Sequence, residues 1–78
     1  MDAERRRAQL MGAALLIVQR DGMLALDTRS LAREANCSPD LVRHYLGKTK
    51  MLRDAVIDFA KRKKLRVVVD EAKTLGLG

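Results

Sequence analysis

Few side chains in this chain of 78 residues could carry out chemistry, and they do not form a catalytic set. His44 is the single histidine, and no serine, cysteine or carboxylate accompanies it in a recognised catalytic motif. Cys37 is the single cysteine, so it is expected to pack as a small apolar residue, with redox sensing as the alternative. Asp54 and Asp58 stand four residues apart among basic residues, which is typical of surface ion pairs. The sequence therefore predicts no enzyme, no metal site and no cofactor.

A second group of reactive side chains lies on the short segment 39–46 and suits recognition of nucleic acid. Val42 and Leu46 stand four residues apart and predict its buried face, so the polar side chains point outward. Arginine can donate two hydrogen bonds to guanine, aspartate can accept one from cytosine, and proline can contact a thymine methyl group. Contacts with base edges are therefore predicted for Pro39, Asp40, Arg43 and His44.

The elements that must position these side chains are two short helices joined by a tight turn. Asp27 or Thr28 can cap the first helix, whose buried face is predicted by Leu31, Ala32 and Ala35. Asn36 tolerates the left-handed conformation that ends a helix abruptly. Ser38 can cap the second helix, and Pro39 at its first position loses no hydrogen bond. The pattern predicts a helix-turn-helix, with an ordinary helical hairpin as the alternative.

Two longer helices are expected on either side of this motif. Residues 2–20 carry an apolar stripe of helical spacing, formed by Leu10, Ala13, Ala14, Ile17 and Val18. Leu24 or Leu26 should anchor the connection in the core. After a turn at Gly47, a further helix should begin at Lys48 or Thr49, with its stripe at Leu52, Ala55, Val56 and Phe59. The expected fold class is all-α, a bundle of about four helices with a domain boundary near residue 60.

Residues 61–78 are expected to extend the last helix beyond the domain formed by residues 1–60. Their apolar residues are Leu65, Val68, Val69, Ala72 and Leu75. On a continuous helix this set would lie roughly 140° around the axis from the preceding apolar stripe. Such a stripe predicts a partner, most simply a second copy of the chain in a homodimer. A helix break near Lys64 and an edge strand at residues 67–69 are the alternatives. The basic run 61–64 is expected to be a solvated face.

The sequence resembles the DNA-binding domain of TetR-type repressors over about residues 5–60. The matching positions are Leu31-Ala32, Ala35-Asn36-Cys37-Ser38, Val42-Arg43-His44-Tyr45-Leu46 and Leu52. The chain departs from the family pattern at Asn36, where glycine is usual, at Leu46, where phenylalanine is usual, and at Thr49, where a phosphate-binding lysine is usual. The resemblance implies a DNA-binding regulator in which residues 39–46 read the major groove.

Charge also favours a polyanionic partner. The chain carries a net charge of +6, and residues 41–66 hold nine lysines and arginines against two aspartates. Phosphate contacts are predicted at the helix starts and beside them, for Thr28, Arg29, Ser38, Tyr45, Lys48, Thr49 and Lys50. Packing does not explain Arg5, Arg6 and Arg7, which can form either a solvated first turn or an N-terminal arm on the DNA.

Together these features predict a sequence-specific regulator of transcription that binds double-stranded DNA as a small dimeric repressor. TetR-type proteins usually carry a larger ligand-binding domain, and this chain ends soon after the fourth expected helix, so no small-molecule inducer is expected. The sequence has no apolar run long enough for a bilayer and no signal-peptide layout, which predicts a cytoplasmic, nucleoid-associated protein in a bacterial or phage-infected cell. Its size suits a phage, plasmid or other mobile element. The alternatives are a DNA-architectural or recombination accessory factor resembling an excisionase, and a protein-interaction module such as an anti-repressor.

Overall fold

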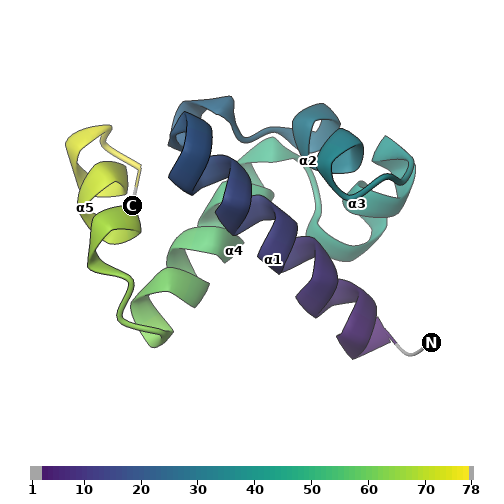
Figure 1. The fold of residues 1–78 in the computed structure, drawn as a ribbon, viewed down its shortest axis with the longest axis horizontal. Helices are drawn as coiled ribbons and strands as arrows, with labels where there is room; N and C mark the ends of the chain where they lie inside the picture. Colours follow the sequence, from purple (N-terminus) through teal and green to yellow (C-terminus); the bar gives the residue numbers. More distant parts are fainter. Residues whose placement is uncertain (1–2, 78) are drawn as a thin grey trace.

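The computed structural model describes residues 3–77, and all regular structure in this range is helical (Figure 1). The long helices α1 (Ala3–Asp21) and α4 (Thr49–Arg62) are separated by the 3-10 helix η1 (Met23–Ala25), α2 (Thr28–Glu34) and α3 (Pro39–Leu46). A fifth α-helix, α5 (Arg66–Thr74), follows α4. The prediction of an all-α bundle is confirmed. The expected start of the first helix at Asp2 lies outside the described residues.

Local hydrogen bonds set the ends of α2 and α3. The Asp27 carboxylate accepts the backbone N–H of Ser30 at 2.7 Å, and the Ser30 hydroxyl accepts the N–H of Asp27 at 2.9 Å, which forms a capping box. Asn36 takes a left-handed φ of 56° in the turn after α2. The Ser38 hydroxyl accepts the N–H of Leu41 at 3.2 Å and caps α3. The helix boundaries predicted for this segment therefore follow from interactions within three residues.

One apolar core holds the helices together. Its largest fully buried side chains are Leu10, Ile17, Met23, Leu26, Leu31, Leu52, Val42 and Val56. Leu26 is the anchor of the connection after α1, whereas Leu24 is exposed. The core also takes in Ile57 and Ala60 of α4, which the predicted stripe did not include. Burial on this scale supplies the main favourable free energy of folding.

The C-terminal part differs from the expected extended helix. The helix α4 ends at Arg62, and the chain turns at Lys63 and Lys64, where Lys64 takes a left-handed φ of 58°. The turn folds α5 back onto the molecule, so Val68 and Ala72 are only 2% and 1% exposed. A stripe that would face away along a straight helix thus reaches the chain's own core. The alternative prediction of a helix break near Lys64 is therefore confirmed. The alternative of an edge strand at residues 67–69 is wrong, because these residues are helical.

A polar contact also joins α5 to the connection after α1. The Glu71 carboxylate accepts the backbone N–H of Met23 through Oε2 at 3.1 Å. The neighbouring Gly22 has a φ of 94°, and a Cβ atom there would lie 3.1 Å from the same carboxylate oxygen. Glycine at this position therefore allows both the turn and the close approach of Glu71. Residues 61–77 pack on the same core as residues 3–60 instead of forming an extension beyond it.

Candidate nucleic-acid interface

The helix α3 presents its polar side chains outward. Val42 and Leu46 are buried in the core, at 0% and 4% exposure. Asp40, Arg43 and His44 are exposed on the other faces of the helix, and Pro39 at its start is half-buried. Three of the four predicted base-contacting side chains are therefore accessible, and the fourth lies at the helix end that a groove would admit first.

Arg43 and Asp40 form an ion pair with each other across one turn of α3. Their side chains are 47% and 88% exposed, so the pair lies at the surface and contributes little to stability. One terminal nitrogen of the guanidinium contacts Asp40, and its remaining N–H groups are available to another acceptor. Both residues are predicted base contacts, and their ion pair, through which Asp40 orients Arg43, was not predicted.

An open cleft of about 410 Å³ joins α3 to the starts of α2 and α4. It is lined by Asp27, Thr28, Arg29, Arg43, Lys48 and Thr49. Four of these were predicted as phosphate contacts from separate parts of the sequence. The hydroxyls of Thr28 and Thr49 lie 3.5 Å apart and connect the two helix starts. We call this site the α2–α4 cleft.

The two helix starts at the α2–α4 cleft differ in their capacity to hold an anion. At α2 the N-terminus is already occupied by the carboxylate of Asp27, and the backbone N–H of Ser30 and then its hydroxyl lower the pKa of that carboxyl group. At α4, a helix of 14 residues, the capping residue is Lys48, and within residues 3–77 no capping side chain accepts its first N–H groups. Uncapped N–H groups, the helix dipole and the Lys48 ammonium all favour an anion at the start of α4.

The other predicted phosphate contacts lie outside the lining of this cleft. The Ser38 hydroxyl is engaged as the cap of α3. Tyr45 is half-buried against the core, and its ring contacts that of His44 edge-on with centroids 5.0 Å apart. Lys50 is 91% exposed and lies 3.6 Å from the Asp54 carboxylate one turn along α4. These three residues are thus less well placed for a phosphate than Arg29 and Lys48.

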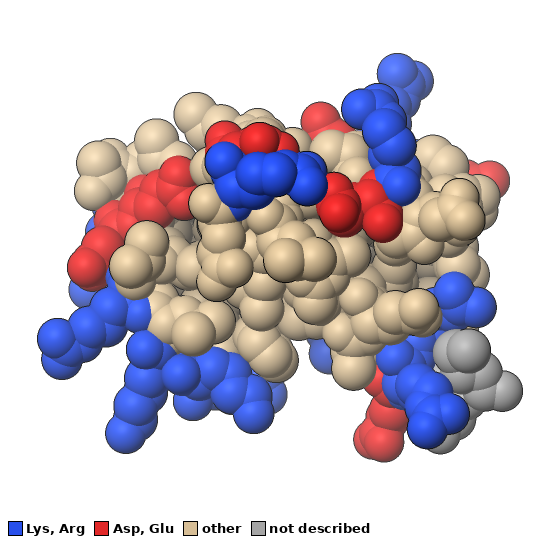
Figure 2. Space-filling view, in the orientation of Figure 1, with Lys and Arg blue, Asp and Glu red and all other residues tan. Residues whose placement is uncertain are grey.

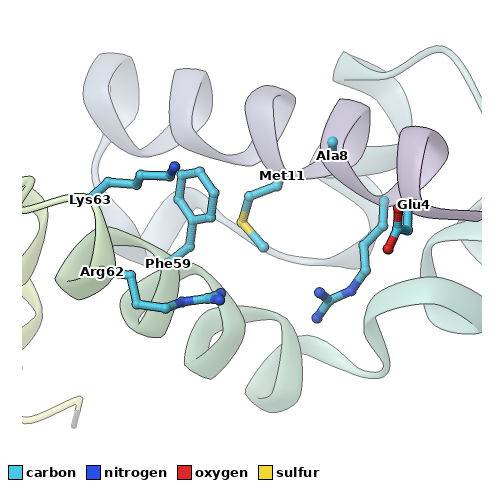
Figure 3. A pocket seen from close by; sticks show the side chains of 7 residues that line it. Glu4, Ala8, Met11, Phe59, Arg62 and Lys63 are labelled. Atoms are coloured by element: carbon cyan, nitrogen blue, oxygen red, sulfur yellow. The ribbon is translucent and has the colours of Figure 1, made fainter.

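The three arginines expected as an N-terminal arm belong to the first two turns of α1. Arg7 lines another open cleft, of about 370 Å³, between the start of α1 and the end of α4 (Figure 3). Met11 and Phe59 form the apolar part of this cleft, and the Lys63 ammonium lies 5.8 Å from the centre of the Phe59 ring. Arg5, Arg6 and Arg7 lie in a regular helix, and their contact with DNA stays a prediction.

The stripe expected as a dimer interface is largely used inside the chain. Val68 and Ala72 are buried, Leu65 and Val69 are half-buried against the same core, and Leu75 is 39% exposed. The expected interface is corrected accordingly, because the turn after α4 brings this stripe onto the chain's own helices. A second copy of the chain would find little of it accessible.

No family model matches the chain, and no curated protein or solved structure shows a significant match to it. Among residues 3–77, no helix has the length and apolar character needed to cross a bilayer. The same residues contain no group of three or more histidine, cysteine or acidic side chains that could hold a metal ion. Cys37 is a half-buried free thiol. The cleft that brings five of the predicted contact residues together is the α2–α4 cleft, beside the exposed face of α3.

Proposed function

We propose that the chain is a double-stranded DNA-binding regulator of transcription that reads the major groove with α3. The observation that carries the proposal is that Arg43, on the exposed face of α3, shares one cleft with Arg29, Lys48 and the uncapped start of α4. A single docked duplex can therefore meet a base-reading side chain and a phosphate-binding site at the same time.

The dimensions support this mode of binding. An α-helix with its side chains is about 10–12 Å in diameter, and the major groove of B-DNA is about 12 Å wide, so the exposed face of α3 can enter the groove. In the proposed complex, the α4 N–H groups and Lys48 hold one phosphate and fix the register. Arg43, oriented by Asp40, donates to a guanine, and His44 contacts a neighbouring base.

A regulator of this kind acts by occupying its site and excluding other proteins, which suits repression, and it works where bacterial DNA is found, in the cytoplasm. A dimeric form would require a surface other than the buried Val68 and Ala72. The same burial gives less support to an anti-repressor that would use the 65–75 stripe on a partner protein.

The proposal is tested by selecting bound duplexes from a random DNA pool and measuring the affinity of variants for the selected sequence. Arg43→Ala should lose about 1–3 kcal/mol of binding free energy and should relax selectivity at one base pair. Lys48→Gln should weaken binding to all sequences alike and should lower the salt slope by about one. The matched control is Arg33→Gln, which removes the same charge from exposed α2 outside the cleft and should change affinity less than twofold.

Two outcomes would contradict the proposal. One is a pool from which no preferred sequence emerges, because α3 would then read no bases. The other is an equal loss of affinity in all three variants, because binding would then depend on net charge and not on the α2–α4 cleft.

A further inference from the structure

A second basic cleft lies at the turn between α4 and α5. Its volume is about 560 Å³, and it is lined by Lys61, Lys64, Arg66, Val69, Asp70 and Lys73. The turn and α3 lie toward opposite ends of the longest dimension of the molecule, which measures 34 Å (Figure 1). Figure 2 shows lysine and arginine side chains gathered along the lower edge at the α4–α5 end. We call this site the α4–α5 cleft.

The cations of the α4–α5 cleft are not neutralised by the protein. Within residues 3–77, none of its four lysine and arginine side chains forms an ion pair, although Asp70 lies in the same cleft. By contrast, the neighbouring Arg62 is paired with Asp58 at 3.2 Å. Four cations around one carboxylate leave a concentrated positive potential that an external anion would relieve.

The backbone at Lys64 is a second and independent observation. Its φ of 58° is left-handed, a conformation that costs free energy for a side chain other than glycine or asparagine. Glycine is the usual residue at this position after a helix. A lysine here places a charge at the edge of the cleft where glycine would give a more stable turn, as is expected if the charge serves binding.

The shape of the cleft favours a nucleic-acid backbone as its occupant. Cations stand on both sides of the cleft. Lys61 lies at the end of α4 and Lys64 in the turn after it, and Arg66 and Lys73 lie on α5. A protruding chain of phosphates fits such a concave surface. A membrane surface would favour apolar side chains that insert beside the cations. The apolar residue that lines the cleft, Val69, is half-buried, and the exposed Val67 of α5 lies outside the lining of the cleft.

The helix α4 fixes the distance between the two clefts. Its first residue lines the α2–α4 cleft, and its end carries the α4–α5 cleft, about 20 Å away at 1.5 Å per residue. The N–H groups at a helix start point along the helix axis. If they point at a phosphate of one duplex, the other end of α4 is carried away from that duplex, beyond the reach of a lysine side chain.

We propose that the α4–α5 cleft binds the phosphate backbone of a second DNA duplex, so that one molecule bridges two duplexes. This inference rests on the proposed function for the first duplex, which occupies the α2–α4 cleft. It adds to that function a role in holding two DNA segments together.

Bridging is measured with two 30-base-pair duplexes. A biotinylated duplex on beads carries the sequence selected from the random pool, which the α2–α4 cleft and α3 bind, and a fluorescent duplex of the same length has a random sequence. The full chain is loaded on the beads at low salt, unbound protein is washed away, and the retained fluorescent duplex is counted per bound protein. The variant Lys61→Gln/Lys64→Gly/Lys73→Gln should retain at least tenfold less of the fluorescent duplex. Its affinity for a single duplex should change less than twofold.

A control variant of equal charge separates position from net charge. Arg29→Gln/Lys48→Gln/Lys50→Gln removes three charges at and beside the α2–α4 cleft and should reduce capture on the beads at least tenfold. The single change Lys64→Gly separates binding from folding. It should lower the retained duplex two- to fivefold while raising the melting temperature by a few degrees, because a strained turn is relieved.

Bridging that persists in the α4–α5 variant, or a wild-type protein that retains no second duplex, would overturn the inference. A third outcome would also overturn it: the wild type bridges no duplexes but binds phosphatidylserine vesicles, and the α4–α5 variant loses this vesicle binding. The cleft would then bind a membrane. Failure of the proposed function would give a different result: the bead-bound duplex would retain as much of the α2–α4 variant as of the wild type.

Discussion

The contact between Glu71 and Met23 allows a direct measurement of how firmly α5 belongs to the fold. Met23 is completely buried, and its N–H donates to the Glu71 carboxylate at 3.1 Å. A hydrogen bond to a charged group contributes about 1.5–3 kcal/mol, and a buried donor without a partner adds a desolvation cost. The change Glu71→Ala should therefore lower the free energy of unfolding by about 2 kcal/mol. For a domain of this size, that corresponds to a melting temperature roughly 8–16 °C lower.

The measurement is urea and thermal denaturation followed by circular dichroism, with two controls in α5. Glu71→Gln keeps a carbonyl oxygen as acceptor and should lose less than about 1 kcal/mol. Asp70→Ala removes a carboxylate from the exposed side of the same helix and should change stability by no more than about 0.5 kcal/mol.

A Glu71→Ala variant as stable as the wild type would contradict this expectation. Met23 would then not depend on α5 for its hydrogen bond, and the burial of Val68 and Ala72 against the rest of the chain would lose its support. A loss as large in Asp70→Ala as in Glu71→Ala would also refute it, because the effect would belong to the charge of α5 and not to this contact.

Three further predictions concern other parts of the chain. Gly47→Ala should lower the free energy of unfolding by about 1–2 kcal/mol. The reason is that φ at this position is 79° and the new Cβ would lie 2.9 Å from the Cβ of Met51. Unchanged stability in urea denaturation would contradict this expectation. Asp27→Ala should cost about 1 kcal/mol at pH 7 through loss of the α2 cap. The pKa of Asp27 is lowered in the folded state, so this difference should be complete above the unfolded pKa, near 4, and should vanish as pH falls through the folded pKa. A difference that stays constant down to pH 2 would exclude the cap. Val68→Ala should lower the free energy of unfolding by about 2 kcal/mol without changing the molecular mass measured by sedimentation. A change of mass at unchanged stability would instead indicate that the 65–75 stripe forms a dimer interface.

The two short helices α2 and α3, the turn between them and the outward face of α3 could be predicted from the sequence alone. The capping box of Asp27 and Ser30, the left-handed Asn36 and the Ser38 cap act over three or four residues, so their effect can be read locally. The spacing of Val42 and Leu46 then fixes which side of α3 is buried, and the exposed positions of Arg43 and His44 follow.

The contacts between distant segments depend on tertiary packing and could not be predicted from the sequence. Thr28 and Thr49 are 21 residues apart, and their contact and the α2–α4 cleft depend on how α2, α3 and α4 pack. The sequence showed a second apolar stripe after Lys64 but not what the stripe packs against. On a straight helix it would face a partner protein, whereas a turn brings it onto the chain's own core. Burial of Val68 and Ala72 on an existing core favours the turn despite the strained backbone at Lys64. That competition between local strain and non-local burial cannot be resolved from neighbouring residues alone.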